Sequence, residues 1–325
     1  MAIIKRPHDK FFKEIFGKPE VMKDFLQNYL PAEILAIIDI KNLTLENNSF
    51  IDEELSENYS DLLFKTGINQ KESYIYLLFE HKSYLSQYTS LQLLKYMIKI
   101  WDSKAGKEKN SKLPLIIPLV IYHGREKWQI DANFIKIIEG IEDLPSGINK
   151  YIPDYEYVLY DLTTYEAEKL KGNIILTETI KIMQAIFHQD INKFKEVLAA
   201  ALLNLENQDW AEEYERYFFT YIIYILNARP DLELEDIYEV SQNVSPERSG
   251  KIMTLAEKLY NEGMEKGMEK GIEKGIEKGR LEGKLEGQRK TAKNFLRLGL
   301  SPEQVAEAAE LPIEEILQLK KEIGN

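Results

Sequence analysis

The sequence predicts a mixed α/β fold, with a helix-flanked sheet in the N-terminal half and helices alone in the rest. Up to residue 122, apolar residues at helical spacing alternate with strand-like apolar runs. Residues 165–245 show helical spacing only. The 325 residues exceed the usual size of one domain. We expect an α/β domain, a helical region, a glycine-repeat segment and a small helical module, at 1–165, 166–250, 251–290 and 291–325.

The N-terminal elements follow from apolar spacing and from turn residues. Residues 1–30 predict one helix that breaks near Gly17-Lys18-Pro19. Residues 50–65 predict a strand, the polar stretch 66–73 a hairpin turn, and 74–82 a second strand that is apolar on both faces. Further predicted elements are a helix at 90–101, a strand at 113–122 and an extended segment at 151–162.

Composition restricts the class of protein. Hydrophobic residues make up 44% and charged residues 30%, as in ordinary soluble globular proteins. The absence of cysteine excludes disulfides and thiolate-bound zinc. No apolar run approaches the length of a membrane span and no signal peptide leads the chain, which predicts a cytoplasmic protein.

The charge distribution is uneven. A net charge of −12 argues against nucleic-acid binding if it is spread evenly. Residues 81–130, however, carry nine Lys or Arg against three acids, a local net charge of +6. This segment is either a phosphate-binding surface or partly a solvated loop around 103–112, and composition alone leaves both open.

Three charged residues suggest metal-dependent hydrolysis. Asp61 and Glu80 come close together if their strands pair across the turn, and Lys82 shares a strand face with Glu80 because side chains alternate. Carboxylates bind Mg²⁺, which activates water for phosphodiester hydrolysis, and a lysine can orient that water. The backbone carbonyl of His81 is a plausible third ligand. The alternative is a surface ion pair, but these charges end an apolar strand, where buried surface demands partners.

The same residues carry a family resemblance. Asp61, Glu80-His-Lys82 and Gln92-Leu-Leu-Lys-Tyr96 resemble the PD-(D/E)XK nuclease pattern. His8 to Lys13, Ser60 to Phe64, Leu78 to Ser83 and Leu113 to Gly124 are similar to the Rpn family of recombination-promoting nucleases and putative transposases. The similarity covers about residues 5 to 165 well, and the tail more loosely.

This resemblance implies a restriction-endonuclease-like core and a metal-dependent DNA endonuclease that promotes recombination. Asp61 and Glu80 would bind Mg²⁺, with Mn²⁺ or Ca²⁺ as alternatives, and Lys82 would orient water. Gln92 and Tyr96 would face the site from the following helix. Ser60 stands where the fullest pattern has proline.

Two further residues are candidates. Asp9 is either a third metal-binding acid from the first helix or only a cap on that helix. His123 follows an apolar strand, and the scarcity of nearby acids favours a loop residue or a DNA contact over a metal ligand.

The C-terminal segment has a four-residue glycine period between Gly263 and Gly287. Interior glycines cost a helix about 1 kcal/mol each, so such a helix needs a partner, and we expect a homo-oligomer through this segment. A flexible linker is the alternative. Residues 291–323 predict three short helices, with a Ser301/Gln304 capping box. We expect this module to contact protein rather than to read DNA.

Two other functions compete with hydrolysis. A transposase that performs strand transfer uses carboxylates without an adjacent lysine, so Lys82 favours hydrolysis. A catalytically vestigial, self-associating interaction protein is consistent with the glycine repeat, but Asp61, Glu80 and Lys82 are intact.

Overall fold

A computed structural model describes residues 6–46, 60–69, 71–80, 86–105, 112–206, 212–246, 249–250, 254, 276, 279–280 and 283–323. The chain forms two compact units. One comprises Ile3–Leu255, and the other consists mainly of Ala256–Asn325.

The larger unit is built on a mixed five-stranded sheet with the strand order β1-β2-β3-β4-β5. The strands are β1 (Thr44–Leu45), β2 (Ser60–Ile68), β3 (Lys71–Glu80), β4 (Leu115–Tyr122) and β5 (Val158–Asp161). β1, β2 and β3 pair antiparallel, whereas β3, β4 and β5 pair parallel. The predicted two-faced apolar strand is therefore the central one, and the α/β prediction is confirmed.

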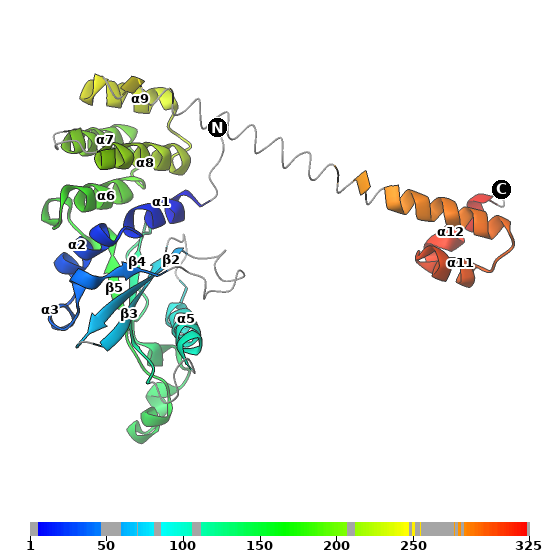
Figure 1. The fold of residues 1–325 in the computed structure, drawn as a ribbon, viewed down its shortest axis with the longest axis horizontal. Coiled ribbons are helices and arrows are strands. Elements are labelled where there is room, and N and C mark those ends of the chain that lie inside the picture. Colours follow the sequence, from blue (N-terminus) through cyan, green and yellow to red (C-terminus); the bar gives the residue numbers. More distant parts are fainter. Residues whose placement is uncertain are drawn as a thin grey trace. The chain divides into compact units, whose positions relative to one another are not determined.

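Helices cover both faces of the sheet (Figure 1), and each face has a separate hydrophobic core. Helix α5 (Thr89–Lys104) covers one face, where its Leu93 and Tyr96 pack with Tyr74, Tyr76 and Val120. The opposite face packs against α1 (Pro7–Phe16), α2 (Pro19–Tyr29) and the later helices. Alternation along β3 explains the division, since neighbouring residues point to opposite faces.

The first two helices confirm the predicted break. α1 ends at Phe16, and Pro19 is the first residue of α2, where its missing N–H costs nothing. A short helix and a 3₁₀ turn, α3 (Ala32–Leu35) and η1 (Ile40–Asn42), lead into β1.

The β2–β3 connection is shorter than predicted. The turn was expected over residues 66–73, but β2 continues to Ile68 and β3 begins at Lys71. The pair Ile68–Lys71 ends the ladder, and Asn69 beyond it has a positive φ of 50°, which asparagine tolerates better than most residues. Thr66 and Ser73 are paired across the ladder instead of forming the turn. Of the predicted strand at 50–65, residues 50–59 lie outside the described residues.

The segment between β4 and the helical region is mostly irregular. It contains η2 (Phe134–Ile137), η3 (Ile141–Asp143), η4 (Ser146–Tyr151), η5 (Leu162–Thr164) and η6 (Ala167–Lys169). The extended segment predicted at 151–162 is strand only over Val158–Asp161, where it pairs with β4, because η4 runs to Tyr151.

Four helices follow, as the spacing predicted: α6 (Ile174–Ala185), α7 (Ile191–Glu206), α8 (Glu212–Ala228) and α9 (Leu234–Val244). They share one continuous core with α1, α2 and the adjacent sheet face. One face of the sheet and these helices thus share a single hydrophobic core.

In the described part of the smaller unit, three helices surround a core of their own. Residues 283–297 are helical, and α11 (Pro302–Ala309) and α12 (Ile313–Ile323) follow. The Ser301/Gln304 capping box is present, with Pro302 at the first helical position. Most of the glycine repeat lies outside the described residues. Within the described ranges, no helix is both long and apolar enough to cross a membrane.

Candidate active site

The β2–β3 register determines which face carries the predicted site. The Cα of Asp61 pairs with that of Leu78. Cross-strand partners share a face, as do residues two apart on one strand, so the Glu80 position belongs to the face of Asp61. Glu80 is the last residue of β3. The register thus brings the two predicted acidic positions to one face near the end of the central strand.

The side chain of Glu80, and all of His81 and Lys82, lie outside the described residues. Their roles stay predictions from the sequence. Among the described residues, no three His, Cys, Asp or Glu side chains gather into a metal-binding group.

Helix α5 brings the two predicted helper residues over this face. Tyr96 is 1% exposed and stacks on Tyr76 of β3, with ring centroids 5.1 Å apart and planes 28° apart. Gln92 lies one turn earlier, on the same face of the helix. The structure therefore places Tyr96 against the strand that leads to Glu80.

Asp61 lies in an unusual environment for a carboxylate. It is 3% exposed, on the sheet face that carries the aromatic cluster of Tyr74, Tyr76 and Tyr96. Burial raises the pKa of Tyr76 well above its ordinary value, and the nearby charge of Asp61 and the Tyr96 hydroxyl raise it further. Tyr76 therefore stays protonated at physiological pH and keeps its hydroxyl proton beside Asp61.

The amide nitrogen of Gln92 is buried and has no hydrogen-bond partner among the described residues. A buried donor without a partner destabilises a fold, so such groups in native structures call for an explanation. A phosphate oxygen or a water molecule at this face would satisfy the nitrogen.

Asp9 lies in the first turn of α1. The N-cap of α1 is Arg6, so Asp9 is in the first helical turn and is not the N-cap residue. Its neighbour His8 contacts His123, with ring centroids 5.5 Å apart, and its Nδ1 lies 2.8 Å from the Tyr224 hydroxyl. These contacts bring the start of α1 to the residue that follows β4.

His123 lies in the loop that follows β4, which is one of the two predicted alternatives, and its side chain is buried. It is 1% exposed, and its Nε2 lies 2.6 Å from the backbone carbonyl of Met183 in α6. The residue type did not predict the burial of the His123 side chain, because histidine is common both in loops and in cores.

Asp161 is an acid at the same sheet edge that sequence reasoning missed. Its Oδ2 accepts from the backbone N–H of Trp128 (2.8 Å), and its Oδ1 accepts from the N–H and hydroxyl of Thr163 (2.9 and 2.7 Å). Both oxygens are thus committed to the loops that follow β4 and β5. The Asp-x-Thr spacing after an apolar run is the signal that could have identified this turn.

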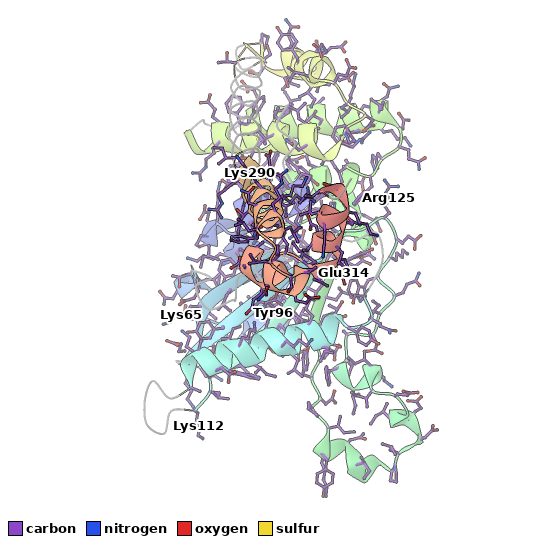
Figure 2. All side chains as sticks on the ribbon, turned by 90° about the vertical axis from the view of Figure 1, so that its right-hand side faces the viewer. Lys65, Tyr96, Lys112, Arg125, Lys290 and Glu314 are labelled. Carbon is purple, nitrogen blue, oxygen red and sulfur yellow. The ribbon has the colours of Figure 1, made fainter. Side chains whose placement is uncertain are left out.

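The described part of the basic segment at 81–130 does not form one patch. Figure 2 shows Lys112 and Arg125 on opposite sides of the larger unit, with Tyr96 between them. Lys104 and Lys112 instead join Lys65 and Lys71 of the β2–β3 hairpin around a depression of about 720 Å³. Local charge in the sequence did not reveal this grouping, because the hairpin lysines lie outside the segment.

One known protein family covers the predicted site residues and most of the chain. Residues 6–213 match the family described as "Putative transposase, YhgA-like". The chain belongs to this family. No solved structure matches it.

Relatives that align with 79% of this chain are known in Escherichia coli. The recombination-promoting nuclease RpnA of strain K12 is 28% identical over 258 residues, covering 79% of this chain and 84% of the relative. RpnD of strain O157:H7, which has the same descriptive name, is 24% identical and covers 79% and 95%. The inactive recombination-promoting nuclease-like protein RpnE of strain K12 is also 24% identical and covers 79% and 82%.

The unpartnered Gln92 amide leads to a stability prediction. Gln92→Met removes a buried donor without changing the volume much, so we expect the free energy of unfolding to rise by about 1 kcal/mol. Gln184→Met is the matched control, because its Nε2 donates to the carbonyls of Leu162 and Tyr165 (2.6 and 2.8 Å). We expect the control to lose about 1–3 kcal/mol in urea unfolding. Equal losses in both variants would show that the Gln92 amide is bonded in the native state.

Proposed function

We propose that the chain is a metal-dependent DNA endonuclease that hydrolyses phosphodiester bonds and thereby promotes recombination. One observation carries the proposal. Asp61 is a buried carboxylate whose sheet face also carries the Glu80 position, with Tyr96 and Gln92 packed above it. The names of RpnA and RpnD, both recombination-promoting nucleases, support the same reaction.

The available donor atoms suit a divalent metal ion. Asp61, Glu80 and the carbonyl of His81 would hold Mg²⁺, which prefers oxygen ligands, and Mn²⁺ or Ca²⁺ would accept the same atoms. The bound ion would neutralise phosphate charge and activate water. Burial of Asp61 fits this use, since a buried carboxylate gains most from an adjacent cation.

The remaining residues position the reacting groups. Lys82 would orient the attacking water through its ammonium group. The Gln92 amide would donate to a phosphate oxygen, which satisfies its unpartnered nitrogen. The Tyr76–Tyr96 stack fixes α5 against the strand beside Asp61.

Two alternatives rest on particular comparisons. The relative RpnE is named inactive at the same 24% identity as RpnD, so overall similarity does not decide activity. A vestigial, self-associating protein is therefore the second candidate. Strand transfer is the third, from the family's description as a transposase. The lysine two residues after Glu80 favours hydrolysis over strand transfer.

Substitution of the site residues tests the proposal on supercoiled plasmid. We expect Asp61→Asn, Glu80→Gln and Lys82→Ala each to reduce metal-dependent nicking at least about a hundredfold, because a catalytic metal contributes several kcal/mol. Melting temperatures should stay unchanged or rise slightly for the two carboxylate variants, since clustered carboxylates repel each other without metal. Asp154→Asn, at an exposed position before β5, is the control. Equal nicking by all five proteins, or none by wild type with any metal, contradicts the proposal.

Salt dependence tests DNA contact through α5. Lys95 is exposed on this helix, and Lys99 follows one turn later. Reversing both to glutamate should weaken DNA binding and lower the slope of log K against log salt by about one to two, since each phosphate contact contributes roughly 0.9. The double reversal of Lys136 and Lys193, both exposed, introduces the same charge change elsewhere. Identical slopes for the two pairs would assign the effect to net charge alone.

Self-association through the glycine repeat is part of the same proposal. A Cβ built on Gly279, Gly283 or Gly287 would meet nothing within 4 Å, so none of these glycines is packed against the described part of this chain. A second copy could approach there. Cutting both DNA strands also calls for two sites, which a two-fold dimer supplies.

Deleting residues 262–325 tests this association. We expect a lower molar mass in light scattering, with nicking retained and linearisation of the plasmid reduced. An unchanged mass at several concentrations would place the association in the larger unit and make the repeat a spacer.

A further inference from the structure

A cavity of about 580 Å³ lies at the carboxyl edge of the parallel strands, against the residues that follow β4 and β5. The last residues of the three parallel strands are in register, because Glu80 pairs with Tyr122 and Tyr122 with Asp161. The residues that follow β4 and β5, together with the end of α6, line the cavity, which is open on one side. Ligands of open α/β sheets bind at this carboxyl edge, and the volume is within the usual range for small-molecule pockets.

Buried polar groups hold the two loops that form the cavity. His123 is bonded to α6 through the Met183 carbonyl, and Asp161 accepts three hydrogen bonds from the loops. Gly124 lies so close to the Tyr122 hydroxyl that a Cβ would come within 1.8 Å of that oxygen. A rigid wall of this kind favours ligand binding, since little order is lost on association.

The wall combines aromatic rings with one guanidinium group. Phe187 and Tyr165 both line the cavity. The Phe187 ring lies 4.6 Å from the His123 ring, and the Arg125 guanidinium carbon lies 5.9 Å from the Phe187 centroid. Aromatic faces and arginine together are the usual means by which proteins hold an unpaired base and its phosphate.

The charges of the lining select the orientation of such a ligand. Lys181 is paired with the buried Glu178 at 2.8 Å, so its charge is neutralised within the protein. Arg125 and Glu168 have no ion pair among the described residues. A ligand that places a phosphate near the Arg125 guanidinium and an uncharged, amino-bearing ring near the Glu168 carboxylate would satisfy both charges.

The position of the cavity relates it to the cleavage site. Neighbouring strands lie about 5 Å apart, so the loop that follows β4 begins one strand away from the Glu80 position. The cavity opens on the α6 side of this edge, and Asp61 faces the α5 side. We infer that this cavity is a subsite for one nucleotide of the DNA strand, adjacent to the phosphate that is cut. The inference rests on the proposed endonuclease function.

The test maps the cuts made by the full-length protein in DNA duplexes that carry one abasic position. If a base occupies the cavity, its loss should suppress cuts at one fixed offset, within two nucleotides, by roughly tenfold. Ala167→Trp fills the cavity mouth from an exposed lining position without removing a side chain. In this variant and in Arg125→Ala, cleavage of intact DNA should fall and the offset-specific suppression should disappear.

Matched variants separate the subsite from general effects. Ala200→Trp, at an exposed position on α7, and Lys136→Ala should keep the wild-type pattern. Metal-dependent cutting with a flat abasic profile, or identical profiles for Ala167→Trp and Ala200→Trp, overturns the subsite while leaving the endonuclease intact. No metal-dependent cutting of unmodified DNA by wild type would overturn the proposed function itself.

Discussion

The pairing of β3 with β2 on one side and β4 on the other is the constraint on which the rest of the larger unit depends. Because side chains alternate, a slip of one residue would move every buried residue of β3 to the opposite face. Tyr76 would then leave α5, and Glu80 would no longer share a face with Asp61. The two separate cores fix this register, since each requires its own set of apolar side chains.

The same register places polar groups in an apolar environment at the candidate site. Asp61 and the Gln92 amide are polar groups on a face that otherwise packs as core. Burial of polar groups lowers stability, but a substrate that bonds to the Gln92 amide, or a metal ion beside the Asp61 carboxylate, would gain from it. RpnD, named a recombination-promoting nuclease, and RpnE, named inactive, are both 24% identical to this chain. Overall similarity, and with it the shared fold, therefore does not distinguish between the two names.

The sequence by itself determined the element order and the identity of the candidate acids. Periodicity distinguished the two-faced strand of residues 74–82 from the amphipathic helix after it, because burial on two faces and on one face leave different patterns. The prolines marked the helix starts, and the Ser301/Gln304 pair marked a cap, since both act through local backbone geometry. These signals are local, so they survive without knowledge of the fold.

Only the tertiary structure decided which distant residues meet. It stacked Tyr96 on Tyr76, buried His123 against α6, and committed both oxygens of Asp161 to neighbouring loops. It also divided the basic segment and grouped part of it with lysines of the β2–β3 hairpin. Residue type and spacing carry no record of such contacts, because strand order and helix packing set the distances between segments that are remote in sequence.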